Sequence, residues 1–130
     1  MTIINLTQHK ATQDQKDAGV VDLPDKLRDQ LVELLTFDDL PDSHEVINRA
    51  NKIAWMIDHF VKSKPTAAMI GGAPFLMPVL DKALRNYGHT PLYAFSKRES
   101  VEKTNPDGTV VKTSVFKHAG FVELGEPSCW

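Results

Sequence analysis

Gly71 and Gly72 follow directly on an uncharged apolar run, residues 66–70, and precede a helical pattern. Paired glycines adopt backbone dihedrals that other residues avoid, and they let a ligand approach the main-chain N–H groups closely. The helix that follows would direct its free N–H groups and the positive end of its dipole toward the same point. The sequence therefore predicts an anion site at this turn, with Gly71, Gly72 and Ala73 in contact with the ligand.

Ser96, Lys97 and Arg98 stand at the end of a second apolar run, residues 92–95. In an open α/β sheet, ligands bind in a crevice outside the carboxyl ends of the strands. Lys97 and Arg98 would stabilise the charge of a phosphate there, and Ser96 would donate a hydrogen bond to it. We interpret the two strand ends as parts of one site and predict Lys97 and Arg98 as its catalytic cations.

A polar loop after the first β-branched run, residues 2–7, supplies the third part of the predicted site. Histidine exchanges a proton most readily near neutral pH, so His9 is the candidate general acid or base. Asn5 and Thr7 are candidate ligand contacts beside it. Each candidate also has a purely structural interpretation. The glycines could serve only a tight turn, and the two cations could be solvated charges of the hairpin. Asn5 and Thr7 could only close a strand, and His9 could be a loop residue without a chemical role.

Composition narrows the class of ligand. The 130 residues are 42% hydrophobic and 25% charged, with a net charge of −2. Residues 12–45 carry ten acids and three bases, whereas residues 91–118 carry five bases and three acids. A long DNA duplex requires a broad basic face, so we expect no duplex binding and favour a small phosphate ligand held by a few cations.

The same sequence argues against membrane insertion and metal binding. No apolar run reaches the roughly 20 residues of a membrane helix, and the first ten residues lack the basic start and cleavage site of a signal peptide, so we expect a cytoplasmic protein. The single cysteine, Cys129, can neither close an internal disulfide nor assemble a zinc site. We expect no metal and no cofactor.

The element pattern predicts one α/β domain over residues 1–130 with a loose tail over 125–130. Apolar or β-branched runs predict strands at 2–7, 20–23, 66–70 and from 92 to 103, and helical spacing predicts helices from 24, from 43 and at 75–87. Asp42 and Glu45 suggest a capping box. Residues 105–108 predict a hairpin turn leading to a strand at 110–116, with an edge strand at 121–124. The expected fold is a small Rossmann-like, mostly parallel sheet with helices on both faces and a C-terminal β-hairpin.

Residues 93–103 and 106–118 resemble the C-terminal hairpin of small CRISPR-associated proteins with a CARF-like Rossmann fold, the stand-alone ring nuclease type. The resemblance is strongest over residues 91–121, is weaker over 1–10 and 66–76, and is missing from the acidic middle. It implies a homodimer that binds a cyclic oligoadenylate across its twofold axis and linearises it without a metal, by attack of a ribose 2′-hydroxyl on the neighbouring phosphate.

Three other functions stay open from the sequence. The first is a sensor or sponge that holds the nucleotide without cleaving it. The second is a Rossmannoid protein that processes a mononucleotide or an NAD derivative, since the glycine turn is similar to those of such enzymes. The third is a structural protein without a ligand.

Overall fold

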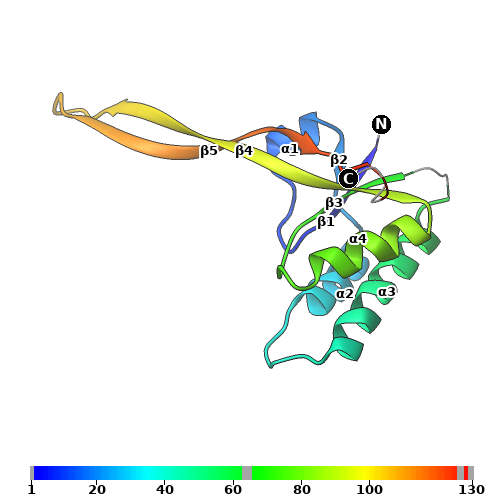
Figure 1. The fold of residues 1–130 in the computed structure, drawn as a ribbon. Helices are drawn as coiled ribbons and strands as arrows, with labels where there is room; N and C mark the ends of the chain where they lie inside the picture. The colour runs from blue at the N-terminus through cyan, green and yellow to red at the C-terminus, as the bar shows by residue number, and fades with distance from the viewer. Residues whose placement is uncertain (1, 63–65, 126–127, 129–130) are drawn as a thin grey trace.

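The computed structural model describes residues 2–62, 66–125 and 128 of the chain (Figure 1). Four helices and five strands lie in this part. In chain order they are β1 (Ile3–Leu6), α1 (Gln13–Asp17), β2 (Val20–Val21), α2 (Asp25–Leu35), α3 (Ser43–Phe60), β3 (Thr66–Ile70), α4 (Met77–Asn86), β4 (His89–Thr104) and β5 (Val110–Val122).

The strands form one sheet in the order β2-β1-β3-β4-β5. β1 pairs in parallel with β2 and β3, and β3 pairs in parallel with β4, whereas β5 returns antiparallel to β4. This confirms the expected small Rossmann-like α/β fold, a mostly parallel sheet with a C-terminal hairpin. Because the parallel strands point the same way, the ends of β1 and β3 lie together at one edge of the sheet.

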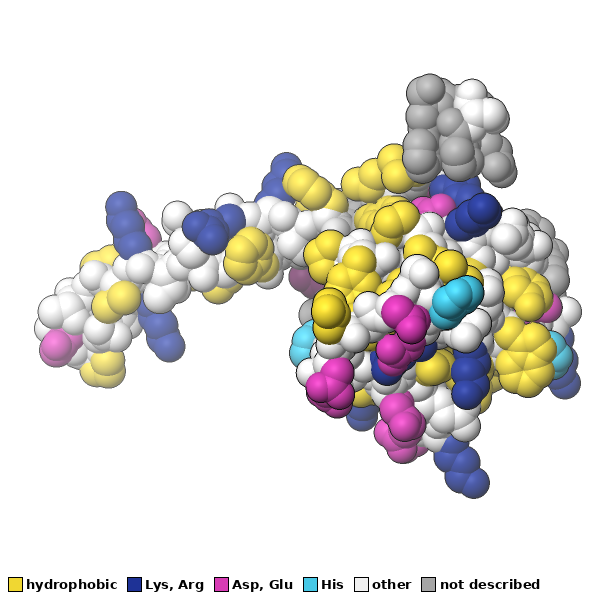
Figure 2. Space-filling view, turned by 60° about the horizontal axis from the view of Figure 1, so that its bottom comes forward, with side chains coloured by type: hydrophobic (Ala, Val, Ile, Leu, Met, Phe, Trp, Pro, Cys, Tyr) yellow, Lys and Arg dark blue, Asp and Glu magenta, His cyan; other side chains and the backbone are white. Residues whose placement is uncertain are grey.

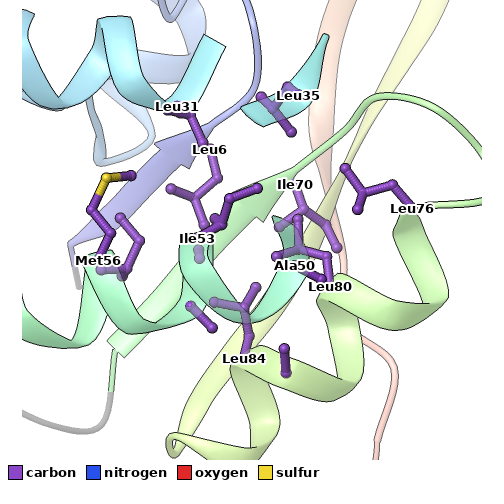
Figure 3. Packing of buried hydrophobic residues seen from close by; sticks show 14 of the residues in the cluster. Leu6, Leu31, Leu35, Ala50, Ile53, Met56, Ile70, Leu76, Leu80 and Leu84 are labelled. Atoms are coloured by element: carbon purple, nitrogen blue, oxygen red, sulfur yellow. The ribbon is translucent and has the colours of Figure 1, made fainter. Parts of the chain in front are cut away.

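Helices cover the two faces of the sheet unequally. α2, α3 and α4 cover one face (Figure 1), and the main core lies between them and the sheet. Figure 3 shows Leu6 and Ile70 of the sheet packed against Ile53, Leu80 and Leu84 of the helices. The opposite face carries a smaller buried cluster of Ile3, Ala11, Val20, Ala67, Met69 and Leu92, against which Phe121 of β5 packs. In the described part of the chain, the five-residue helix α1 lies beside β2 and β5 next to this cluster.

The N-cap expected at Asp42 is confirmed, whereas the capping box expected there is incomplete. The Asp42 carboxylate accepts the Glu45 N–H at 2.9 Å, as expected of an N-cap. The Glu45 carboxylate instead pairs with Arg49 at 2.8 Å, so the expected capping box is only half formed at α3. A complete capping box lies at α1, where Thr12 and Gln15 bond each other's backbone N–H groups.

β4 and β5 continue far beyond the rest of the sheet as a two-stranded arm, which we define as residues 95–119 (Figure 1). β3 pairs only with residues 89–93 of β4, so the arm has β5 as the one partner of β4. Figure 2 shows lysine, arginine and hydrophobic side chains along it. Residues 105–109 form the turn that joins the two strands of the arm, and Gly108 in this turn has a φ of 87°.

The prediction of a separate edge strand at residues 121–124 is wrong. Phe121 and Val122 are the end of β5 and pair with Ala94 and Tyr93. A register shift beside Phe95 and Ser96 places one extra residue in β5, which lets the strand bend there and continue. The expected loose tail falls mainly on residues 126–127 and 129–130, which lie outside the described residues, as does Cys129.

Candidate functional site

A cavity of about 580 Å³ opens where β1 and β3 end and β4 passes beside them. The residues that line it come from the loop after β1, the turn after β3, the middle of β4 and the start of α1. They are Thr7, Gln8, His9, Lys10, Thr12, Gln15, Met69, Ile70, Gly71, Gly72, Tyr93 and Ala94. The structure therefore brings Thr7, His9, Gly71 and Gly72 together, as the convergence of strand ends predicted.

Asn5 lies beneath this cavity and shapes the loop that lines it. Its side chain is fully buried. The amide nitrogen donates to the His9 carbonyl and to Asp22 Oδ1, both at 2.8 Å, and the amide oxygen accepts the Thr7 N–H and hydroxyl at 2.9 and 2.7 Å. Both ends of the amide are thus engaged within the protein, and Asn5 fixes the loop from below without lining the cavity.

Asp22 and Gln8 hold the same loop from two further directions. Asp22 Oδ1 accepts the Ala11 N–H at 3.0 Å as well as the Asn5 amide. Burial raises the pKa of Asp22, but these hydrogen bonds and the nearby charges of Arg28 and Lys16 outweigh it, so the net pKa lies below the ordinary value. Gln8 reaches Thr36 Oγ1 at 3.2 Å on the other side. The loop is therefore fixed before any ligand arrives.

Arg28 of α2 contributes a cation that sequence analysis did not consider. Its Nη2 donates to the Gln8 carbonyl at 3.2 Å, and its Nη1 is buried without a hydrogen-bond partner in the described part of the chain. The guanidinium charge also lies near Asp22, where it helps to lower the pKa of that carboxyl group. Arg28 therefore supports the loop both by a hydrogen bond and by charge.

The glycine turn forms the second wall of the cavity. Gly72 has a φ of 151°, a backbone conformation that would be strained in a residue with a side chain. A Cβ on Gly71 would lie 3.4 Å from Thr7 Cγ2. The turn thus lies against the β1 loop with its backbone accessible. The helix does not follow at once, however: residues 74–76 form a turn, and α4 begins only at Met77.

Because α4 begins only at Met77, its N-terminus is not part of the site. The Leu76 N–H is already bonded to the Ala73 carbonyl at 3.0 Å, and none of residues 73–78 lines the cavity. Ala73 packs instead against the main core. The anion site expected from the turn therefore depends on the glycine backbone and not on the helix dipole.

Tyr93 anchors the β4 wall to α4. Its hydroxyl donates to Asp81 at 2.7 Å, and Asp81, which is buried, also pairs with Arg85 at 2.6 Å. Burial raises the pKa of Tyr93, and the hydrogen bond to the Asp81 carboxylate raises it further. The phenol therefore stays protonated and holds this part of β4 in place beside the cavity.

Ser96, Lys97 and Arg98 lie beyond the cavity, on the arm. Ser96 pairs with His118, Lys97 with Lys117 and Arg98 with Phe116. Since side chains of a strand alternate between two faces, Ser96 and Arg98 share the face of Ala94, whereas Lys97 points to the other. The Arg98 guanidinium lies 5.3 Å from the centre of the Phe116 ring.

Two aromatic rings extend the cavity-side face of the arm. His118 and Phe121 are in contact, with ring centres 4.8 Å apart, and Phe121 pairs with Ala94 of the cavity wall. His118 Nδ1 is buried and has no hydrogen-bond partner among the described residues. The cavity therefore continues into a surface of two rings, a serine and an arginine.

The charge of the cavity suits an anion. Lys10 and His9 are among its lining residues, and none of the described residues that line it carries a carboxylate. This is notable in a chain with a net charge of −2. Within the described ranges, no group of three or more His, Cys, Asp or Glu side chains is arranged to hold a metal ion.

A family model matches residues 1–122, from before β1 to the end of β5. The chain belongs to the uncharacterized protein MJ1673 family. No curated protein and no solved structure matches it. The matched residues include those that form the cavity and those that form the arm.

Sequence reasoning missed Lys10, Thr12, Gln15 and Tyr93 as lining residues. The capping-box spacing of Thr12 and Gln15 was a usable signal, because it marks the start of α1 beside the β1 loop. Tyr93 carried no such signal, since its position depends on Asp81 of a different element.

Among helices of the described residues, none is long and apolar enough to cross a membrane.

Proposed function

We propose that the chain binds a cyclic oligonucleotide, or a related nucleotide, at the cavity between the β1 loop, the glycine turn and β4. The observation that carries this proposal is the convergence of three strand segments on one cavity that has Lys10 and His9 but no carboxylate among its described lining residues. Such a cavity attracts a phosphate and disfavours a cation.

The two parts of the site suit different parts of a nucleotide. The Gly71 and Gly72 backbone and Lys10 would hold a phosphate, with charge-assisted hydrogen bonds. The exposed Phe116 ring and the Arg98 guanidinium beside it offer a surface on which a base would stack. A ligand that uses both parts must be larger than a mononucleotide, which favours the oligonucleotide suggested by the resemblance to ring nucleases.

Ring opening at this site would need no metal. The ribose 2′-oxygen forms a bond to the neighbouring phosphorus, the bond from phosphorus to the 5′-oxygen breaks, and the product carries a 2′,3′-cyclic phosphate. His9 would take the 2′-hydroxyl proton, and the 5′-oxygen would leave with a proton from solvent. Lys10 and the glycine N–H groups would stabilise the charge on the phosphorane oxygens.

A cyclic ligand has several equivalent phosphates, so two copies of the chain would each supply half of the complete site. The homodimer is therefore part of this proposal. So is a cytoplasmic location, where a nucleotide signal would be produced.

The test is a titration of the purified chain with cyclic oligoadenylates of several ring sizes, followed by mass analysis of the products. We expect submicromolar to micromolar binding of one ring size and a linear product with a 2′,3′-cyclic phosphate. This product has the same mass as the ring, so it is distinguished from the ring by its chromatographic retention and by its fragments. Binding without a product would remove the catalytic part and leave a sensor or sponge. Binding of a mononucleotide or an NAD derivative in preference to every ring, or of no nucleotide at all, would contradict the proposal.

A further inference from the structure

One face of the arm is both apolar and basic. The cross-strand register places residues 95, 97, 99, 101 and 103 of β4 on the same face as residues 111, 113, 115 and 117 of β5. We call this the docking face. Its hydrophobic members are Phe95, Val101, Val111 and Val115, and its lysines are Lys97, Lys103 and Lys117.

The docking face is left uncovered by the chain's own fold. Its hydrophobic side chains are exposed, from 42% for Val101 to 52% for Phe95. An isolated two-stranded ribbon is only marginally stable in water, and a contiguous exposed apolar surface usually marks an interaction site. The docking face is therefore suited to a partner surface with hydrophobic side chains and negative charge.

The helical layer carries a groove of that description. It has a volume of about 470 Å³ and lies between the start of α3 and the start of α4, with Leu40, Val46, Ile47, Phe75 and Val79 among its lining residues. Leu40 is 98% exposed, so the rim of the groove presents a hydrophobic side chain to solvent. Four acids lie on the same loop or in the first turn of α3. Asp38 and Asp39 belong to the loop, Asp42 caps α3, and Glu45 pairs with Arg49.

We propose that the docking face of one copy binds in this groove of a second copy. The match is twofold: valines and Phe95 meet the hydrophobic groove, and the three lysines meet the acids beside it. The arm points away from the helical layer of its own chain (Figure 1), so it does not lie in its own groove. The arm that we place in the groove is therefore that of a second copy. A twofold axis would create the contact twice and close the assembly.

This inference rests on the proposed pairing of two copies but not on any nucleotide. A nucleic acid is the less suitable partner for this face, because four of its nine residues are hydrophobic and Glu99 is a further member. Phosphate contacts require cations and polar groups, whereas buried valines gain nothing from them.

The test measures the oligomeric state of the full, ligand-free chain by sedimentation over a range of protein concentrations. We expect a dimer, a dissociation constant raised at least tenfold by Val115→Glu or Leu40→Glu, and a change of less than twofold for Ser114→Glu. Ser114 is the matched control, since it adjoins Val115 and points to the opposite face. All three substitutions fall on exposed positions, so near-unchanged thermal unfolding of monomeric fractions checks that the body is intact.

A cross-link gives an independent measurement. In a Cys129→Ser background, Leu40→Cys combined with Val115→Cys is expected to form a disulfide-linked dimer under mild oxidation, whereas Leu40→Cys with Ser114→Cys is not. A monomeric wild-type chain, a dimer unaffected by Val115→Glu and Leu40→Glu, or equal cross-linking of both pairs would overturn the proposal. A monomer that binds duplex DNA through Val115 would also overturn it, by assigning the face to nucleic acid. Nucleotide binding is titrated separately, so either proposal can fail alone.

Discussion

Lys97 and Arg98 are neighbours in the sequence and point to opposite faces of the arm. Lys97 lies across from Lys117 on the docking face, and Arg98 lies across from Phe116 on the face that continues from the cavity. A single phosphate therefore cannot be clamped by both side chains of one protomer. The pair that the sequence presents as one cationic unit is divided by strand geometry into two surfaces.

Arg98→Ala should weaken nucleotide binding about tenfold to a hundredfold, because a charge-assisted contact contributes roughly 1.5 to 3 kcal/mol. Lys97→Ala should leave nucleotide affinity within about threefold and instead weaken dimerisation, since its side chain faces away from the cavity. Calorimetric titration at saturating dimer concentration measures the first effect and sedimentation the second. Lys62→Ala, at an exposed position, is the control. Equal loss of nucleotide affinity from both arm substitutions would show that Lys97 and Arg98 act on one phosphate after all.

His9→Ala should lower the rate of ring opening about a hundredfold or more while changing nucleotide affinity little. The side chain is exposed at the cavity, whereas the His9 carbonyl is the group that Asn5 holds, so the loop should keep its shape without the imidazole. Single-turnover product formation gives the rate, and equilibrium titration gives the affinity. Cleavage at the full rate in the variant would mean that the cations and glycine N–H groups act without a proton-transfer group from His9.

The convergence of the strand ends was predictable because each signal was local. An apolar run followed by glycines or by polar residues indicates a strand end, and the parallel arrangement then brings such ends together. The extra turn before α4 was not predictable in this way. Pro74 and Phe75 fit a helix start as well as a turn. In the structure the turn coincides with the burial of Leu76 in the main core, a tertiary contact that local sequence does not reveal.

The arm shows the other limit of sequence analysis. Alternation of residue types predicted both strands and the turn at residues 105–108, but alternation does not reveal whether a face is covered. The valines of the docking face have the pattern of an ordinary half-buried strand. Only the structure shows that β3 stops pairing at Tyr93 and leaves the rest of β4 with β5 alone.

Asn5→Ala should lower the free energy of unfolding by about 2 kcal/mol or more, because it leaves buried hydrogen-bonding groups of the β1 loop without a partner. It should also weaken nucleotide binding, since the loop loses its support from below. Asn48→Ala, at an exposed position of α3, is the matched control and should change stability by less than about 0.5 kcal/mol. Urea unfolding of the three proteins measures the difference. A variant as stable as the wild type would show that the Asn5 contacts do not hold the loop.

Asp22 should make stability depend on pH in the acidic range. Its folded-state pKa lies below the ordinary value of 3.8, through hydrogen bonds from Asn5 and Ala11 and the charges of Arg28 and Lys16, which outweigh burial. As the pH falls from 3.8 toward the lower folded-state pKa, the unfolded chain binds a proton before the folded chain does. The stabilisation that the Asp22 charge provides at higher pH is therefore progressively lost. Asp22→Asn keeps an oxygen acceptor for both hydrogen bonds but removes the charge. The difference in unfolding free energy between wild type and variant should therefore be constant above about pH 5 and shrink below about pH 4. Asp29→Asn, an exposed acid of α2, should show no such trend, and a difference for Asp22→Asn that stays constant down to pH 3 would mean that the charge of Asp22 does not stabilise the loop.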